Sequence, residues 1–334
     1  MNSREYSCIK IISRGLCSLC GACISICPHN AIELYDDIYI SYNKCKNCGL
    51  CIQVCPSTIT PSSLQLTPIA AYSARSTSST ILRNSQDGGV VTSLLSAALN
   101  MNIIDCVLVT KAKENVIPVP TLATSLEEII EAAGSKYAYS PILSLIKEVK
   151  RSCNSLGIVG LPCHIRALNL IRKRFPSLIE KPRIIISLFC FENFHPKILK
   201  SIIRDKLGLS LFNVNKLAIR KGSLIAYTRE GVKQSISLKS LSDYVLPVCK
   251  LCPEFVSPLS DISVGSIGSP QGWSTVLVWS QRGKELLEHA FKAHYIKIKP
   301  LSKKALTLIH ELAKIKQKRA EEYAKHIDPQ NKIK

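Results

Sequence analysis

Aromatic residues are scarce in this chain of 334 residues, at 6%, and the 24 acidic residues are outnumbered by 44 Lys and Arg. No apolar run reaches about 18 residues, so we expect no transmembrane helix. The first residues lack an apolar core of signal-peptide length, and the chain runs almost directly into Cys17. We therefore expect a cytoplasmic protein, either free or held on the cytoplasmic face of a membrane complex through a partner.

The shortage of acidic residues leaves a formal net charge of +20. A basic surface favours anionic partners, such as an acidic protein, acidic lipid, or a cofactor rich in phosphate and carboxylate. A solvated, lysine-rich surface is the alternative interpretation. We expect no nucleic acid partner, because basic and aromatic residues do not interleave as they do in stacking platforms.

Cysteine, by contrast, is abundant, with 15 residues. Eight of these form two runs with the spacing C-x-x-C-x-x-C-x-x-x-C-P, and the runs begin at Cys17 and Cys45. This spacing is typical of thiolates that bind iron–sulfur clusters, and it indicates a reducing compartment rather than a disulfide framework. Structural zinc is the alternative, but zinc sites usually show paired C-x-x-C knuckles.

The last cysteine of each run is too far from the other three to close the same loop. In two-cluster ferredoxins it binds the other cluster. We therefore predict two [4Fe–4S] clusters, each held by three cysteines of one run and the last cysteine of the other. The first cluster takes Cys17, Cys20, Cys23 and Cys55, and the second takes Cys45, Cys48, Cys51 and Cys27. Between the runs, residues 31–42 indicate a hairpin around Asp36-Asp37.

Beyond a stretch rich in Ser, Thr and Pro, strand-like and helix-like segments alternate, which predicts an α/β (α+β) catalytic domain behind a small N-terminal bacterial-type ferredoxin domain. The predicted domains are a ferredoxin domain at 1–66, a linker at 67–80, a catalytic domain at 81–300 and a basic amphipathic helix at 301–334. The predicted strands are 105–110, 156–159 and 183–189. The predicted helices are 90–99, 126–133, a segment ending at 175, and 196–207, and residues 216–240 indicate a hairpin or meander.

Four further cysteines lie where a third site is expected. Cys163 and Cys190 each follow the end of a predicted strand, and Cys249 and Cys252 form a C-x-x-C pair. Strand ends gather at one edge of an α/β sheet, so the four thiols are placed to meet and hold a third cluster. Zinc, a redox-active pair and inert core cysteines remain open. Cys8, Cys106 and Cys153 have no evident companions, and we expect Cys106 to be a small core residue.

A glycine pair, Gly88-Gly89, precedes the predicted helix at 90–99. Glycines at the start of a helix allow the backbone to approach a phosphate closely, with the helix N-terminus facing it. The segment is not a G-x-G-x-x-G fingerprint, so an ordinary Rossmann dinucleotide site is not supported.

With this segment the chain becomes recognisable, because six motifs occur in order: SQDGGVVTSLLSAAL (85–99), AGSKYAYSP (133–141), GLPCHIRAL (160–168), LFCFENF (188–194), CKLCPEF (249–255) and DISVGSIGSPQGWSTVLV (261–278). They resemble the family of coenzyme F420 hydrogenase/dehydrogenase beta subunits. The resemblance covers roughly residues 76–300. An N-terminal ferredoxin unit is a common fusion partner in that family.

The resemblance implies FAD beside a [4Fe–4S] cluster and a hydride exchanged with coenzyme F420. It implies that Cys163, Cys190, Cys249 and Cys252 hold that cluster, which makes three clusters in all. The implied flavin contacts are Gln86, Asp87, Gly88, Gly89, Thr92, Ser135, Lys136 and Tyr137. The loop from Gly268 to Trp273 is a further candidate wall. Lys136 as a surface charge and Trp273 as a core anchor are the structural alternatives, and His164 is expected to be a structural histidine with satisfied hydrogen bonds.

A flavin converts between hydride and single-electron chemistry, so we expect it between F420 and the clusters. The predicted function is an oxidoreductase that exchanges a hydride with F420 through FAD and relays single electrons through the clusters to a larger redox complex or a ferredoxin-like acceptor. Two alternatives are a reductase of another organic substrate and a non-enzymatic electron-transfer subunit. The C-terminal helix carries an apolar stripe of Ala305, Leu308, Leu312 and Ile315, which packs on its own domain, docks a partner or lies on a membrane surface.

Overall fold

The computed structural model describes residues 11–12, 15–35, 37–58, 66–114, 116–179 and 182–326. Cys8 and Asp36 therefore lie outside the described residues. Within these ranges, no helix is both long and apolar enough to cross a membrane.

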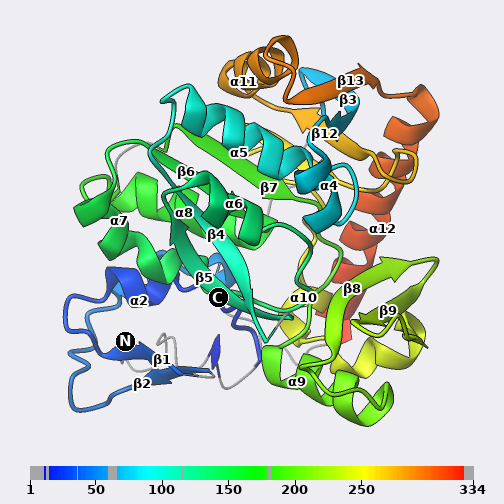
Figure 1. Ribbon diagram of the computed structural model, residues 1–334. Helices are drawn as coiled ribbons and strands as arrows, with labels where there is room; N and C mark the ends of the chain where they lie inside the picture. The colour runs from blue at the N-terminus through cyan, green and yellow to red at the C-terminus, as the bar shows by residue number, and fades with distance from the viewer. Residues whose placement is uncertain are drawn as a thin grey trace.

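An eight-stranded mixed sheet forms the centre of the molecule, in the order β13-β3-β12-β11-β7-β6-β4-β5 (Figure 1). The four middle strands β11, β7, β6 and β4 are parallel, and the strands that flank them pair antiparallel. The bounds are β3 Ala70–Ser76, β4 Cys106–Lys113, β5 Ile117–Ala123, β6 Leu156–Gly160, β7 Ile184–Leu188, β11 Ile262–Gly265, β12 Ser274–Val278 and β13 Ile296–Pro300. This sheet, with its helices, confirms the α/β class.

Helices cover both faces of the sheet because its middle strands are apolar on both sides. In β7, Ile184 and Ile186 pack into a core with α5 and α11, whereas Ile185 packs into a second core with α8. A parallel strand that is buried on both faces has a continuous apolar sequence, which is why a strand at 183–189 could be predicted. The helices around the sheet are α4 Ser79–Asn84, α5 Val90–Asn100, α6 Leu126–Glu131, η3 Ile142–Leu145, α7 Ile146–Ser152, α8 Pro162–Arg174 and α11 Gln281–Lys292.

The N-terminal unit lies against one edge of this domain (Figure 1). It comprises α2 Ala22–Ile26, β1 Ile32–Leu34, β2 Ile38–Ile40, α3 Leu50–Gln53 and η2 Pro56–Thr58. The β1–β2 pair is antiparallel, so the predicted hairpin is confirmed. Gly21 and Gly49 follow the second cysteine of each run and adopt φ values of 84° and 73°, which turn the chain into α2 and α3.

A smaller three-stranded sheet, β10-β9-β8, stands beside the ferredoxin unit, and it confirms the meander predicted at 216–240. Its strands are β8 Val214–Arg220, β9 Ser223–Thr228 and β10 Lys233–Ser237, flanked by α9 Pro196–Ser201, the π-helical turn η4 Ile202–Lys206, η5 Leu238–Tyr244 and α10 Pro247–Lys250. One apolar core joins this lobe to the ferredoxin hairpin, because Ile32 and Ile38 share it with Phe194 and Val214.

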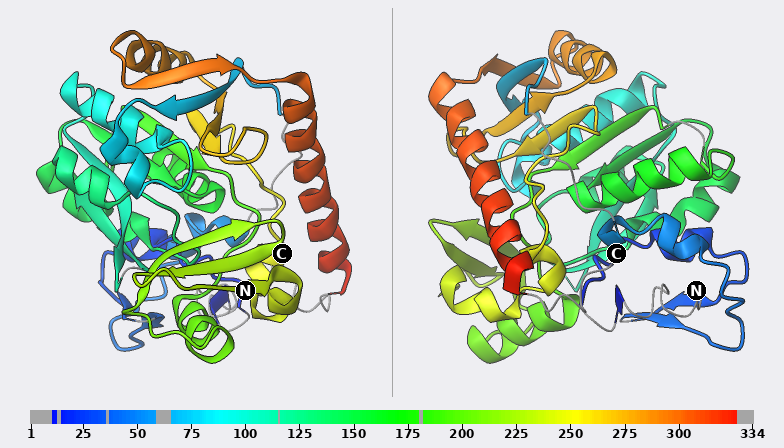
Figure 2. Two further views of the ribbon diagram at one scale, coloured as in Figure 1. Left: turned by 45° about the vertical axis from the view of Figure 1, so that its right-hand side comes forward. Right: turned by 180° about the vertical axis from the view of Figure 1, so that it is seen from behind.

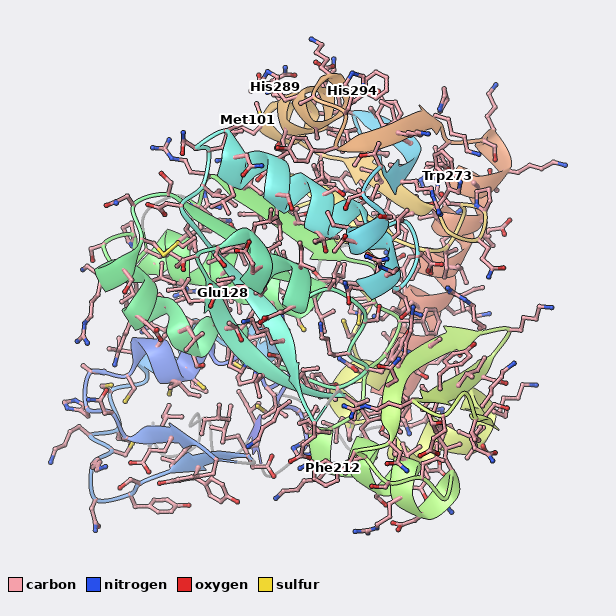
Figure 3. The ribbon with its side chains drawn as sticks, viewed as in Figure 1. Met101, Glu128, Phe212, Trp273, His289 and His294 are labelled. Atoms are coloured by element: carbon pink, nitrogen blue, oxygen red, sulfur yellow. A yellow bond between two sulfur atoms is a disulfide. The ribbon has the colours of Figure 1, made fainter. Side chains whose placement is uncertain are left out.

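Two expectations differ from the structure: the linker at 67–80 and the absence of a companion for Cys106. The linker expected at 67–80 contains β3, which hydrogen-bonds to β12 and β13 within the main sheet. Cys106 has a companion after all, because it forms a disulfide with Cys153 (Figure 3). Cys106 begins β4 and Cys153 follows α7, so a core strand and a neighbouring helix bring the two thiols together.

The C-terminal helix α12, Lys303–His326, packs along the side of its own chain, as Figure 2 shows. The predicted apolar stripe was only half right, however, because Ala305 and Leu312 pack inward whereas Leu308 and Ile315 are 42% and 55% exposed. The buried face carries Ala305, Ile309, Ala313, Lys316 and Ala320. Small side chains let the helix approach closely, and a lysine occupies a position that an apolar pattern cannot identify.

Candidate functional site

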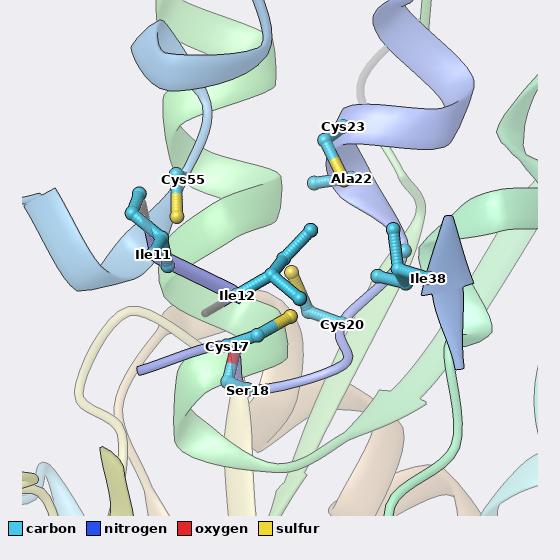
Figure 4. A pocket seen from close by; sticks show the side chains of 10 residues that line it. Ile11, Ile12, Cys17, Ser18, Cys20, Ala22, Cys23, Ile38 and Cys55 are labelled. Carbon is cyan, nitrogen blue, oxygen red and sulfur yellow. The ribbon is translucent and has the colours of Figure 1, made fainter. Parts of the chain in front are cut away.

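The four cysteines predicted for the first ferredoxin cluster line one pocket. Cys17, Cys20 and Cys23 approach it from the loop before α2 and from α2 itself, and Cys55 approaches from the end of the second run. Figure 4 shows the four around a shared space, with Ile11, Ile12 and Ile38 on its walls. The structure thus brings together three cysteines of one run and the last cysteine of the other, as the ferredoxin pattern predicts.

This pocket disfavours free thiolates. Burial, and then the neighbouring thiols, raise the pKa of Cys20 to about 11 and of Cys55 to about 12. The pKa of Cys17 rises well above its ordinary value for the same reasons. Thiolates gathered in such a place need a positive partner, which the iron atoms of a cluster supply. The residues therefore fit a cluster.

A single zinc ion fits the pocket less well. Zinc–sulfur bonds of about 2.3 Å bring four Sγ atoms within about 4 Å of one another. Across the described ranges, the one set of three ligand-type residues whose atoms all lie within 4.8 Å is Asp105, Cys106 and Cys153. No three of the four described pocket cysteines therefore meet the spacing that one zinc ion requires.

The second ferredoxin set lies nearer the surface. Cys45 and Cys48 are exposed, and Cys51 is partly buried. Cys27 is buried, and its sulfur accepts the Ala31 N–H at 3.3 Å. This part of the N-terminal unit is thus open to solvent at two of the four predicted ligands.

The four remaining predicted ligands converge at the carboxyl ends of β6 and β7. Cys163 is the second residue of α8, directly after β6, and Cys190 follows β7. Cys249 lies in α10 and Cys252 follows it. Burial raises the pKa of Cys163 well above its ordinary value, and Cys252, Cys190, Cys20 and Cys249 raise it further, in that order. Burial likewise raises the pKa of Cys190 to about 12.

Charged side chains that the sequence analysis missed surround this set of four, which we call the core cysteines. Arg166 of α8 donates to Glu254 Oε2 at 2.7 Å and lies 4.0 Å from Cys252 Sγ. Its other amino group donates to the Pro56 carbonyl at 3.1 Å. Lys316 of α12 reaches the same place from the far end of the chain. Arg166 stands one helical turn after Cys163, a spacing that was available as a signal.

A second polar region contains several of the predicted flavin contacts. Asp87 Oδ1 accepts from Arg220 Nη2 at 2.6 Å, and Lys216 donates to the Ser85 carbonyl at 2.7 Å. Asp87 Oδ2 and both polar atoms of the Gln86 side chain are buried, and they have no hydrogen-bond partner among the described residues. Buried polar atoms normally find hydrogen bonds, so these three mark a place where a polar ligand fits. The sequence analysis did not identify Lys216 and Arg220 as site residues because the sequence of β8 contains no recognisable motif.

From the segment 135–137, Tyr137 contacts the same region. Tyr137 Oη accepts the Ile219 N–H of β8 at 3.2 Å, and burial raises the pKa of that tyrosine. Lys136 Nζ instead donates to the carbonyls of Ala132 and Ala133 at the C-terminus of α6, at 2.5 and 2.8 Å. Burial lowers its pKa to about 8. The Lys136 ammonium is therefore occupied by the α6 C-terminus.

The glycine pair has a structural reason of its own. A Cβ on Gly88 would lie 2.6 Å from both the Ala74 carbonyl oxygen and the Ser274 nitrogen, so the loop packs directly on β3 and β12. Gly89 has a φ of 68° and caps α5, and Thr92 in the first turn of that helix is buried. The close backbone approach that the sequence indicated is therefore made to the sheet.

The loop at 268–273 lies beside β3, because Ser269 Oγ and Ser73 Oγ are 2.7 Å apart. Trp273 lies on the side of the molecule that carries β13 and α12 (Figure 3), with the Lys299 ammonium 4.4 Å from its ring centroid.

His164 is buried, and its Nδ1 accepts the Leu161 N–H at 3.2 Å. Its Nε2 has no hydrogen-bond partner within the described part of the chain, so only one of the two ring nitrogens is satisfied. Burial lowers the pKa of His164 to about 4.

Three family models match the chain. Residues 71–147 match the model for the N-terminal part of the coenzyme F420 hydrogenase/dehydrogenase beta subunit, and residues 153–304 match the model for its C terminus. Residues 16–59 match a 4Fe-4S dicluster domain.

Several curated relatives are similar over most of their length. The chain is 37% identical to the beta subunit of the coenzyme F420 hydrogenase of Methanosarcina barkeri, over 74% of this chain and 88% of the relative. It is 29% identical to one subunit of the F(420)H(2) dehydrogenase of Methanosarcina mazei, over 92% of this chain and 91% of the relative. A chain in the solved F420-reducing [NiFe] hydrogenase complex from Methanosarcina barkeri superposes with a TM-score of 0.74 at 35% identity, covering 80% of this chain and 94% of that one.

Proposed function

This chain belongs to the family of coenzyme F420 hydrogenase/dehydrogenase beta subunits and carries a 4Fe-4S domain, and from that premise we propose that it exchanges a hydride with coenzyme F420 through FAD. We further propose that it relays single electrons through three [4Fe–4S] clusters to a partner redox complex. Bound flavin supplies the exchange between two-electron and one-electron chemistry, and the protein supplies binding and orientation.

One observation carries the proposal: the five residues 135–139 connect the polar region to the core cysteines. Tyr137 lies near enough to Arg220 and Asp87 for their charges to act on its pKa, beside the larger effect of burial, and Ser135 hydrogen-bonds to Tyr137. Two residues later, the buried Tyr139 hydroxyl lies 2.8 Å from Cys249 Sγ. A flavin held at 135–137 would therefore be the immediate neighbour of a cluster held by the core cysteines.

The polar region suits a flavin on chemical grounds. The unpartnered Gln86 amide offers both a donor and an acceptor, as the edge of a flavin ring requires. Lys216 and Arg220 place two positive charges beside it, which suits the diphosphate of FAD or the anionic tail of F420. Gly88 and Gly89 let this loop pack closely on β3 and its neighbours, and we propose that both glycines and Thr92 also contact the flavin.

The contacts of Arg166 support an order for the proposed relay. The guanidinium spans from Cys252 to the carbonyl of Pro56, the residue that follows Cys55. Cys20 is also close enough to raise the pKa of Cys163. The core cysteines are therefore adjacent to the first ferredoxin pocket. We place the first ferredoxin cluster next in the sequence of electron transfer.

The second ferredoxin cluster would then exchange electrons with the partner, because Cys45 and Cys48 are the exposed members of the set. The relatives suggest what the partner is. One relative is named as part of a hydrogenase and another as part of an F(420)H(2) dehydrogenase, and the second match extends over 92% of this chain. We propose that this chain likewise serves a larger redox complex, with a ferredoxin-like acceptor as the alternative.

The test is an anaerobic absorbance titration of the reconstituted protein with reduced F420, after flavin and iron per chain have been measured. We expect one FAD and about twelve iron atoms, four for each cubane cluster. Flavin and cluster bands should bleach together. Asp87→Asn should lower flavin occupancy while the iron content stays constant. The exposed control Glu131→Gln should change neither.

Each alternative gives a different result. If dithionite bleaches flavin and clusters but reduced F420 leaves them oxidised, the protein is a reductase of another organic substrate. If the protein binds iron but no flavin, it is a non-enzymatic electron-transfer subunit.

A further inference from the structure

Lys316 is a charged residue in the interior of the protein, on the buried face of α12, where the other buried side chains are apolar. Its side chain is 1% exposed. Its ammonium donates to the carbonyl oxygens of Cys190 and Glu254, both at 2.6 Å. Cys190 is a core cysteine, and Glu254 stands two residues after Cys252. The lysine therefore ends beside the chain segments that present three of the four core cysteines.

The nearby carboxylates are already neutralised by other cations. Glu254 pairs with Arg166 at 2.7 Å, and Glu192 pairs with Arg319 at 2.8 Å. Among the described residues, Lys316 forms no ion pair with a carboxylate. A buried ammonium without an anion carries a large desolvation penalty. Its two hydrogen bonds hold the ammonium at the segments that carry Cys190 and Cys252, so an anion bound by the core cysteines would be the nearest charge that can compensate it.

We propose that Lys316 is a charge-compensating residue for a core [4Fe–4S] cluster and raises its reduction potential. This inference rests on the proposed cluster at Cys163, Cys190, Cys249 and Cys252. Reduction adds one negative charge to the cluster, and a fixed ammonium beside it favours the reduced state. Lys316 lies beyond residue 304, where the family model ends, so α12 supplies this charge from outside the matched domain.

The experiment is an EPR-monitored redox titration of the full reconstituted chain. Lys316→Gln keeps two N–H donors for the two carbonyls and removes the charge, whereas Lys316→Arg keeps the charge. Lys314→Gln is the matched control, because Lys314 is exposed two residues away on the same helix. The signal lost in Cys252→Ser identifies the core cluster, and the ferredoxin signals serve as an internal reference.

We expect Lys316→Gln to lower the reduction equilibrium constant of the core cluster about tenfold, which is about 59 mV for one electron. The ferredoxin signals, Lys316→Arg and Lys314→Gln should stay at wild-type values. If Lys316→Gln loses the core cluster while Lys316→Arg retains it, charge compensation is also supported.

An unchanged potential in Lys316→Gln overturns the inference while leaving the cluster in place. Equal loss of iron in Lys316→Gln and Lys316→Arg overturns it as well, because charge would then make no difference. If the wild-type chain binds only about eight iron atoms, the proposed core cluster is itself wrong.

Discussion

Substitution of Arg166 tests how the ferredoxin unit is held against the rest of the chain. Its guanidinium contacts the Pro56 carbonyl on one side and Glu254 and Cys252 on the other. The Arg166 and Glu254 side chains are 12% and 4% exposed, so water screens the pair little. We predict that Arg166→Met destabilises the protein by about 3–5 kcal/mol, because it leaves the Glu254 carboxylate buried without its partner.

The size of this effect can be expressed as a melting temperature. At about 2.1 cal/mol/K per residue, unfolding 334 residues has an entropy of about 0.7 kcal/mol/K. The midpoint should therefore fall by about 4–7 °C in anaerobic calorimetry of protein with matched iron and flavin content. The double variant Arg166→Met/Glu254→Gln should recover part of that loss, because it removes the stranded charge.

Lys111→Met is the control, since it breaks an ion pair with Glu131 in which the two side chains are 22% and 65% exposed. Such a pair contributes about 1 kcal/mol at most, or about 1 °C. The reasoning is refuted if Arg166→Met melts within a degree of the wild type. It is refuted equally if the double variant melts no higher than the single variant.

Three further predictions concern the relay, one buried lysine and the disulfide. Cys45→Ser should remove the second cluster and stop reduction of a one-electron protein acceptor. Reduced F420 should still bleach the flavin of this variant. Loss of both acceptor reduction and flavin bleaching would contradict the proposed order. Burial lowers the pKa of Lys136 to about 8. The unfolded chain therefore binds more protons between about pH 8 and 10.5, so stability should rise with pH across that window by up to about 3 kcal/mol, and Lys136→Met should lack this rise in pH-dependent denaturation. Alkylation of unfolded, metal-free protein should label two more thiols after reduction than before, and Cys153→Ser should abolish that difference.

The first ferredoxin pocket could be predicted from sequence because its chemistry is local. A thiolate every third residue fixes three ligands within one loop, so the spacing alone names the first pocket, and Cys55 joins Cys17, Cys20 and Cys23 as expected. The middle strands were predictable for a similar reason, because burial on both faces leaves a continuous apolar run. The edge strand β5 was missed because it contains Pro118 and Pro120, which strands tolerate at a sheet edge but which signal a loop in sequence.

What the sequence could not predict is which distant charges meet at the core cysteines. Arg166, Glu254 and Lys316 come from three segments, and no periodicity relates them. Lys316 lies on a helix whose apolar pattern pointed to Leu308 and Ile315, but those side chains face solvent while the lysine faces inward. Hydrophobic periodicity assumes that charge lies outside, and this assumption fails where the interior itself is charged.

That failure is informative about the chain. Glu254 takes the Arg166 guanidinium with its side chain and the Lys316 ammonium with its backbone carbonyl, so it joins α8 to α12 beside Cys252. Two buried cations for one buried carboxylate leave an excess of positive charge, and a folded interior does not retain such an excess without an anion. A cluster bound by four thiolates is an anion of suitable size, and the four core cysteines lie at that point. The buried charges that sequence analysis missed are therefore consistent with the proposed cluster, which the cysteine pattern alone left open.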